Sequence, residues 1–480
     1  MSSEKPTVAE LHARPAIETV NGKTVYHCGT LDYTRKTLIY LFIWMLWGDF
    51  CYTMMEMLIP TLLPLVLKQH QASNTTIGLL VGSIPALVNF ILNPIISTSS
   101  DRTRSRWGRR IPYLLFSSPF VVLFLILVGW SDQIGAWFYR LAWGEGGSPA
   151  MLIIVMLGIF SVGFQLFNLF VASVFYYIFS DVVPKPFVGR FMALFRVVGT
   201  AAGIVFSRYI LPMADRKEMI PWIFTGVALI YLFSFTQMCF MVKEGNYPPP
   251  EKLKKVNPWT LLKKYSVECF SMPFYLYLFI GLAVNTTSNA CRVMFNLLYA
   301  KEDLGLTLEQ YGHIASTVSL VMLFAYIPLG WIVDKFHPLR VFLLGGFLIV
   351  AANVFGFFFC HNYVTFFIVT FMISGTYVLQ GASGLPLTVR MYPSEKYGQF
   401  CSAAAMISSI VLIVANAGGG AFIDLGVKYG AKYGLGYNLI FVWDFIFTII
   451  ANALLLVVYF KWKKYGGDKN YVAPVKNVSI

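Results

Sequence analysis

One short polar turn does most to constrain what this chain can fold into. Residues 93–113 read NPIISTSSDRTRSRWGRRIPY, in which five arginines and one aspartate stand between two long apolar runs. The hydrocarbon core of a bilayer offers no water for such a density of charge. The stretch therefore predicts a tight turn at a membrane surface, and its positive charges place that turn on the cytoplasmic side.

The composition indicates that lipid surrounds most of the chain. Of the 480 residues, 57% are hydrophobic and only 12% are charged, whereas soluble domains carry about 25% charged residues. The net charge of +14 could indicate a nucleic-acid partner, but the basic residues lie in short loops and tails beside apolar runs. This pattern favours contact with an anionic inner leaflet, so we expect a lipid bilayer and no nucleic acid as partner. The seven cysteines show no metal-ligand spacing, so we expect no metal and no cofactor.

Twelve apolar runs are each long enough to span a bilayer. The loops that follow the even-numbered runs are rich in Lys and Arg, and the opposite loops are nearly balanced in charge. The sequence therefore predicts an all-α membrane protein with both termini in the cytoplasm. The runs cover approximately 38–67, 76–99, 111–131, 150–179, 188–211, 219–242, 271–300, 309–333, 339–360, 363–388, 397–424 and 437–461.

An internal repeat divides these runs into two groups of six. Ser97-x3-Asp101 ends the second run as Gly330-x3-Asp334 ends the eighth, and a Pro-x4-Gly turn follows both the fourth and the tenth. Matching motifs in register indicate a duplicated unit, hence two pseudo-symmetric six-helix bundles. The expected division is a cytoplasmic tail over 1–37, a first bundle over 38–242, a cytoplasmic linker over 243–270, a second bundle over 271–461 and a cytoplasmic tail over 462–480.

The turn between the second and third runs also carries a family resemblance. D-R-T-R-S-R-W-G-R-R at 101–110 resembles the signature loop of major facilitator superfamily transporters. Its Arg-Trp-Gly-Arg form is similar to that of glycoside–pentoside–hexuronide:cation symporters and the related sucrose/maltose carriers. The resemblance implies a cytoplasmic charge cluster that gates an alternating-access cycle; the alternative is that these charges only set topology. The gating residues so implied are Asp101, Arg102, Arg109, Arg110, Gly330, Asp334 and Lys335.

Ionisable and amide side chains form one stripe on each of two equivalent spans. Such residues inside a membrane are costly and usually functional. Their spacing by three and four places each set on a single helix face. In the superfamily fold both spans line the central cavity, so the stripes predict a substrate pathway. The first span carries Asp49, Tyr52 and Glu56, and the seventh carries Asn285, Asn289, Arg292 and Asn296.

The carboxylates of the first stripe, Asp49 and Glu56, are our candidate proton carriers. Glu56 and Arg292 fall at similar depth from the external face, so we expect that they could pair across the cavity. Withdrawal of the arginine would then favour proton binding by the carboxylate, and its return would favour release. Two alternatives stay open: a static salt bridge, or an Arg292 that binds an acidic substrate such as a uronide.

Other polar residues within the spans fit a cavity that binds a sugar, because their side chains both donate and accept hydrogen bonds. Arg196 could instead pair with Asp49 or extend to the cytoplasmic surface. These further candidates are Gln165, Asn168, Arg196 and Gln380.

The resemblance leads us to expect a sugar or glycoside symporter in the cell membrane, acting as a monomer. Asn89 and Asn93 stand where the sodium-coupled melibiose branch uses paired aspartates, which favours protons over sodium. Carriers of uronides, lipids, peptides or nucleosides share the scaffold and remain alternatives. A non-transporting sensor is a remote one because the tails are short. The spans show no nucleophile–base grouping at helical spacing, so we do not expect an enzyme.

Overall fold

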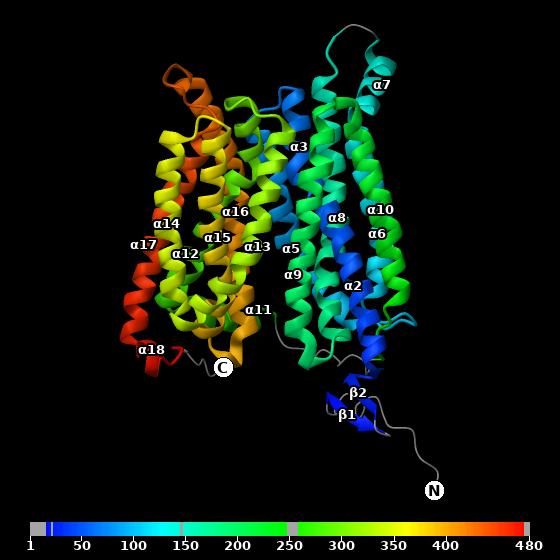
Figure 1. The fold of residues 1–480 in the computed structure, drawn as a ribbon, viewed down its shortest axis with the longest axis vertical. Helices are drawn as coiled ribbons and strands as arrows, with labels where there is room; N and C mark the ends of the chain where they lie inside the picture. Colours follow the sequence, from blue (N-terminus) through cyan, green and yellow to red (C-terminus); the bar gives the residue numbers. More distant parts are fainter. Residues whose placement is uncertain (1–15, 21–22, 145–146, 247–257, 475–480) are drawn as a thin grey trace. The chain divides into compact units, whose positions relative to one another are not determined.

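The computed structural model describes residues 16–20, 23–144, 147–246 and 258–474. Within these residues the chain is helical except for one small sheet near the N-terminus (Figure 1). Twelve long helical segments correspond to the twelve apolar runs, and they confirm the predicted class of an all-α membrane protein.

The first six segments are α2 and α3 (Arg35–Glu56, Leu58–Gln69), α4 to α5 (Asn74–Gly78, Leu79–Ser83 as η1, Ile84–Arg102), α6 (Ile111–Gly129), α8 (Ala150–Val182), α9 (Val188–Val205) and α10 (Ile220–Met241). The second six are α12 (Pro273–Leu298), α13 (Leu308–Lys335), α14 (Pro338–Phe359), α15 (Tyr363–Met391), α16 (Tyr397–Gly430) and α17 (Leu439–Lys464).

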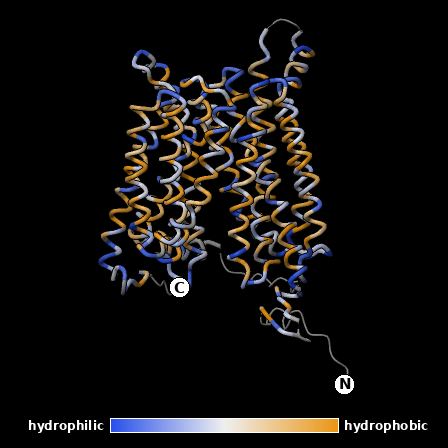
Figure 2. The backbone as a smooth tube through the Cα atoms, in the orientation of Figure 1, coloured by the Kyte–Doolittle hydropathy of each residue, from blue (hydrophilic) through white to orange (hydrophobic). Residues whose placement is uncertain are grey.

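Polar residues distinguish two of these segments from the rest. Ten helical stretches of the described residues are long and apolar enough to cross a membrane by length and composition. The two long segments outside that set are α12, which carries the predicted polar stripe, and α13. Apolar colour follows most of the long helices, and polar colour gathers at their ends (Figure 2).

The helices pack into two compact units. The first comprises residues 1–59 and 88–252, and the second comprises 60–87 and 253–480. These units follow the predicted bundles except for residues 60–87, which the sequence division places in the first bundle. This segment holds α3, α4 and η1, and it packs against α16 within the second unit.

Proline explains why the chain can change unit at both ends of this segment. Proline lacks an N–H and clashes with the carbonyl four residues earlier in a helix. Pro60 directs this clash at Glu56, and helix α2 ends at Glu56 before α3 begins. Pro85 follows η1, a single π-helical turn that breaks the regular hydrogen-bond ladder. Each junction therefore interrupts the helix that runs through it.

The predicted repeat is visible in the turns after the fourth and tenth spans. Pro184 precedes a 3-10 turn, η2 (Lys185–Phe187), and α9 then begins. Pro393 likewise precedes η7 (Ser394–Lys396), and α16 then begins. The same sequence motif thus forms the same local structure in both halves.

Three elements lie in segments that the sequence division left as tails, turns or linker. An antiparallel sheet of β1 (Ile17–Val20), β2 (Lys23–Cys28) and β3 (Leu31–Tyr33) occupies the predicted N-terminal tail. Its second hairpin turns at Gly29, whose positive φ of 57° suits a two-residue hairpin loop. Helix α7 (Ser131–Trp143) follows the third span, and α11 (Pro258–Phe270) lies in the predicted linker, of which 247–257 are outside the described residues.

Candidate functional site

The polar stripe of the first span forms a buried cluster in the first unit. Asp49 is 1% exposed, and Thr53 donates a hydrogen bond to its Oδ1 at 3.5 Å. Its Oδ2 is buried without a hydrogen-bond partner among the described residues. One turn further, the Tyr52 hydroxyl donates to Glu56 Oε1 at 2.8 Å. Helical spacing thus brings two carboxylates to one face of α2, as predicted.

Helices α8 and α9 complete this cluster. The Asn168 side chain on α8 hydrogen-bonds to Glu56, while its Oδ1 is buried and unpaired among the described residues. On α9, a Cβ added at Gly199 would lie 3.7 Å from Asp49 Oδ2. Arg196, one turn before this glycine, is exposed, and Gln165 is half-buried on α8. Within the described part of the chain, no Lys or Arg forms an ion pair with Asp49 or Glu56.

A second buried cluster surrounds Arg292 in the second unit. Its Nη2 lies 3.2 Å from Asp444 Oδ2 on α17 and also donates to Asn353 on α14. The guanidinium stacks over the Phe441 ring, 4.9 Å from its centroid. Asp444 is fully buried and accepts a further bond from Tyr377 at 2.9 Å. The arginine is therefore neutralised and held by two neighbouring helices, α14 and α17.

The amides of the seventh span have different partners. Asn285 donates to Gln380 Oε1 on α15 at 3.2 Å, and Asn296 donates to the Tyr311 hydroxyl on α13 at 3.4 Å. Asn289 lies on the same helix and is half-buried. The structure thus links two predicted cavity residues, Asn285 and Gln380, directly.

Each of the two residues that were expected to pair across the cavity has partners within its own unit, and the pairing of Glu56 with Arg292 stays a prediction. Arg292 has Asp444 as its carboxylate, and Glu56 has Tyr52 and Asn168 as its partners. The sequence pattern identified the helix face of Arg292 but not the carboxylate, which lies 152 residues further along the chain.

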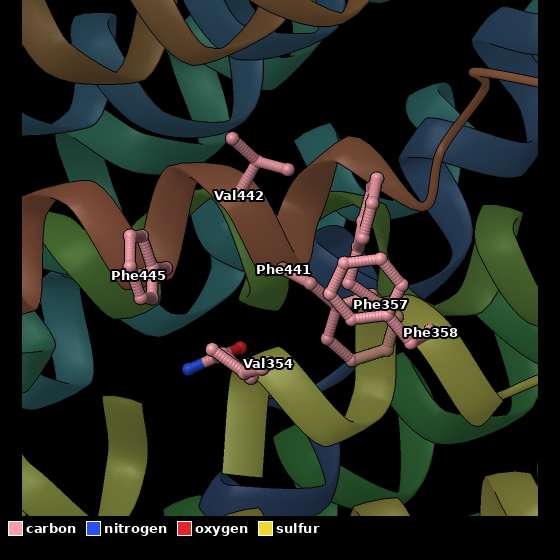
Figure 3. Close-up of a pocket in the computed structure, with 7 residues that line it drawn as sticks. Val354, Phe357, Phe358, Phe441, Val442 and Phe445 are labelled. Carbon is pink, nitrogen blue, oxygen red and sulfur yellow. The ribbon is translucent and has the colours of Figure 1, made fainter. Parts of the chain in front are cut away.

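One pocket lies behind the Arg292 cluster, between α14 and α17 (Figure 3). It has a volume of about 200 Å³ and is lined by Asn353 and six apolar side chains, among them Phe357, Phe358 and Phe441. Phe358 is 61% exposed. The Asn353 oxygen that could serve a ligand is already bonded to Arg292, so the pocket suits an apolar group rather than a sugar.

A third cluster lies at the arginine-rich turn of the first unit. Arg109 binds the Asp181 carboxylate at the end of α8 through its Nε and Nη2 groups, at 2.9 and 2.5 Å. Arg110 Nε donates to the same carboxylate at 3.2 Å, and its Nη1 donates to Ser100. Such paired, charge-assisted bonds fix geometry as well as charge.

Glu244, just beyond α10, binds the backbone at the start of α6. Its carboxylate accepts the backbone N–H groups of Arg109, Arg110 and Ile111 at 2.9, 2.8 and 2.7 Å. A helix start leaves such donors unpaired, and a negative charge is favourable there. Burial raises the pKa of the Glu244 carboxyl, and the three N–H donors oppose that shift.

The N-terminal sheet contacts both segments that supply these carboxylates. The Cys28 thiol donates to the Asp181 carbonyl at 3.4 Å, and the Tyr26 ring packs edge-on against Phe187 at 4.9 Å. Thr30 Oγ1 accepts the backbone N–H of Asn246 at 2.7 Å. The sheet therefore contacts the two segments that carry the charge cluster. The sequence-based division, which left this region as a tail, did not predict these contacts.

The other predicted gating residues stand apart from this network. Arg102 is exposed, and the side chain of Asp101 lies outside what the structure describes. In the second unit, the Lys335 ammonium lies 4.9 Å from the Trp331 ring centroid. A Cβ at Gly330 would meet no atom within 4 Å, and the Asp334 side chain is also outside the described residues.

Comparison with known proteins identifies the family of this membrane protein. A family model described as MFS/sugar transport protein matches residues 44–420. The chain belongs to this family of the major facilitator superfamily. No curated protein sequence matches the chain.

Solved transporters share the fold at low sequence identity. A bacterial homologue of the human lysosomal transporter Spinster, in an inward-facing and unoccupied conformation, superposes with a TM-score of 0.68 at 14% identity, covering 92% of this chain and 100% of that one. A D-xylose–proton symporter gives 0.64 at 12% identity, covering 87% and 97%. A nucleoside transporter gives 0.63 at 10% identity, covering 87% and 100%. The chain is therefore similar in fold to carriers of diverse small molecules.

The sequence pattern did not assign four residues of these clusters as partners of the arginines or of the arginine-rich turn. Asp181 and Glu244 are acidic residues at the ends of apolar runs, next to the same turn as the arginines. Asn353 and Asp444 are single polar residues inside apolar runs, which is the signal that could have indicated them.

We expect Asp444→Asn to destabilise the protein by about 3–5 kcal/mol, because it leaves the Arg292 charge buried without a counter-charge. A double variant with Arg292→Gln should recover much of that loss. The unfolding temperature of the purified protein in detergent measures both. The control is Asp468→Asn, whose bridge to Arg340 is about half exposed and should contribute at most about 1 kcal/mol. Equal losses for the two aspartate variants would contradict the assignment.

We expect Glu244→Gln to cost about 1–3 kcal/mol, because an amide NH2 would face backbone donors that now bind a carboxylate oxygen. Glu218→Gln is the matched control, since Glu218 is exposed on the opposite turn. Thermal unfolding of both proteins, followed by tryptophan fluorescence, gives the comparison. Indistinguishable midpoints would show that Glu244 does not cap α6.

Proposed function

We propose that this major facilitator protein is a secondary active transporter that couples entry of a sugar or glycoside to protons by alternating access. The observation that carries the proposal is the pair of carboxylates on α2, Asp49 and Glu56, which have no cationic partner among the described residues. Charge inside a membrane protein is otherwise paired, as Arg292 is.

Proton binding is the chemistry that suits these two carboxylates. A buried carboxylate that binds a proton loses its charge and with it the desolvation cost. Tyr52, Thr53 and Asn168 supply hydrogen bonds that can serve the carboxyl in either protonation state. Asp49 and Glu56 are thus the proposed proton carriers, and sodium is the alternative that the experiment below separates.

A neutral substrate fits the second unit better than an acidic one. Arg292 would be the residue to bind a uronide carboxylate, but Asp444 and Asn353 already occupy its guanidinium. The amides Asn285, Asn289, Asn296 and Gln380 remain the proposed sugar contacts there, with Gln165 and Asn168 in the first unit. The family description and the symporter among the structural relatives support a sugar.

The proposed setting follows from charge. The arginine-rich turn, the linker and both termini lie in the cytoplasm, because the loops on their side of the spans hold most of the Lys and Arg. The protein acts as a monomer in the cell membrane, without a metal or cofactor.

The test is uptake of labelled mono-, di- and uronic sugars into proteoliposomes, under a proton gradient or an equal sodium gradient. We expect one neutral sugar to accumulate with protons alone. Glu56→Gln or Asp49→Asn should lower accumulation about tenfold or more while exchange of labelled for unlabelled sugar continues. Glu309→Gln, at an exposed site on α13, should transport normally.

Two outcomes would contradict this proposal in different parts. Accumulation driven by sodium alone would overturn the coupling ion. The substrate class would be overturned if a protein that elutes as a folded species in gel filtration accumulated no sugar under either gradient.

A further inference from the structure

Residues 60–87 belong to the first half by sequence and to the second unit by packing. They form a hairpin whose turn, 70–73, lies at the opposite end of the first two spans from the arginine-rich turn. The positive-inside orientation therefore places this hairpin turn on the external side.

A single carboxylate holds the first turn of α4 against α16. Asp424 Oδ1 accepts the backbone N–H and the side-chain amide of Asn74 at 2.9 and 2.8 Å. Asp424 Oδ2 accepts the backbone N–H and the hydroxyl of Thr75 at 2.8 and 2.7 Å. All four donors lie in the first turn of α4, where backbone N–H groups lack helical partners and favour a negative charge.

Close backbone approach surrounds this contact. A Cβ added at Gly420 would lie 2.1 Å from the Asn74 carbonyl oxygen, and one at Gly78 would lie 2.2 Å from the Asn416 carbonyl oxygen. One turn deeper, Ser83 donates to the Ile413 carbonyl at 2.6 Å. Small residues on both helices thus let α4 and η1 pack directly against α16.

The helices are interrupted at both ends of the hairpin. Pro60 stands just past the break between α2 and α3, and η1 and Pro85 interrupt the second span. These interruptions coincide with the points where the chain leaves one unit and enters the other, after residue 59 and after residue 87. A segment that is interrupted at both ends can move as a piece once its bonds to α16, at the tip and at Ser83, are released.

We propose that residues 60–87 are a movable external gate and that Asp424 is its latch. Release of the Asn74 and Thr75 donors from Asp424 frees the tip of the hairpin, and the bonds of Ser83 to Ile413 and Ala417 then break as the pathway opens on the external side. The Gly78–Asn416 and Gly420–Asn74 approaches re-form the seal when the hairpin returns. The latch rests on the proposed alternating access and orientation, but not on the sugar or the proton.

Cys291 provides a reporter that needs no substrate. It is 1% exposed and its Sγ lies 3.5 Å from the position of a Cβ at Gly419. Its helix, α12, also packs against α4 and η1. In a chain whose other cysteines are replaced by serine, a membrane-impermeant maleimide on right-side-out vesicles should reach Cys291 only when the gate opens.

Asp424→Asn should speed this labelling about tenfold, because one carboxylate oxygen becomes an NH2 that faces the donors of α4. The matched control is Glu309→Gln: Glu309 is an exposed acidic residue in the first turn of α13, on the same side. It should label at the parent rate.

A second pair of variants tests the same gate by steric means. Gly420→Ala should also speed labelling, since its methyl group would displace the Asn74 carbonyl. Gly418→Ala should not, because its nearest neighbour would be Trp443 at an ordinary 3.7 Å. All variants are first checked by gel filtration.

Labelling of Asp424→Asn and Gly420→Ala at their control rates would overturn the latch. Because the readout uses no sugar and no ion gradient, a failure of the proposed substrate or coupling would leave this result unchanged.

Discussion

The bilayer core gives no water to a buried charge, so each ionisable side chain inside this protein must be satisfied by the protein itself. Arg292 meets that constraint fully: Asp444 neutralises it, Asn353 accepts from it and Phe441 covers it. Asp49 and Glu56 meet it only with neutral donors. The two units therefore differ within their spans: the second holds a buried ion pair, and the first holds two carboxylates that are bonded to neutral donors.

The same constraint shapes the end of the first unit that carries the arginine-rich turn, where charge is dense and paired. Asp181 binds two arginines of the turn, and Glu244 binds three backbone N–H groups beside them. The N-terminal sheet contacts the segments that carry both carboxylates. Motion of the arginine-rich turn thus has to disturb its bonds to α8 and to the segment after α10, both of which also contact the sheet.

The sequence predicted those features that depend on periodicity and length. Apolar runs predicted the spans, and steps of three and four residues predicted the shared faces of Asp49 with Glu56 and of Asn285 with Arg292. Periodicity does not reveal which residue a side chain meets across a helix interface, so the Asp444 partner was missed. The sheet had a local signal, Asn21–Gly22 between short β-prone segments, which is typical of a hairpin. The packing of 60–87 with the second unit had none, because it depends on contacts about 350 residues apart in the chain.

Glu56 lies where the proposed proton carrier and the proposed gate of residues 60–87 meet in the chain. It is the last residue of α2, and its carbonyl is the group that Pro60 leaves without a helical donor. Its side chain is bonded within the first unit to Tyr52, while the chain four residues later belongs to the second. A hairpin that swings about Pro60 therefore turns the backbone immediately beside this carboxylate. Movement of the gate and the surroundings of the proposed proton carrier are linked by a few covalent bonds, with no long pathway through side-chain packing required.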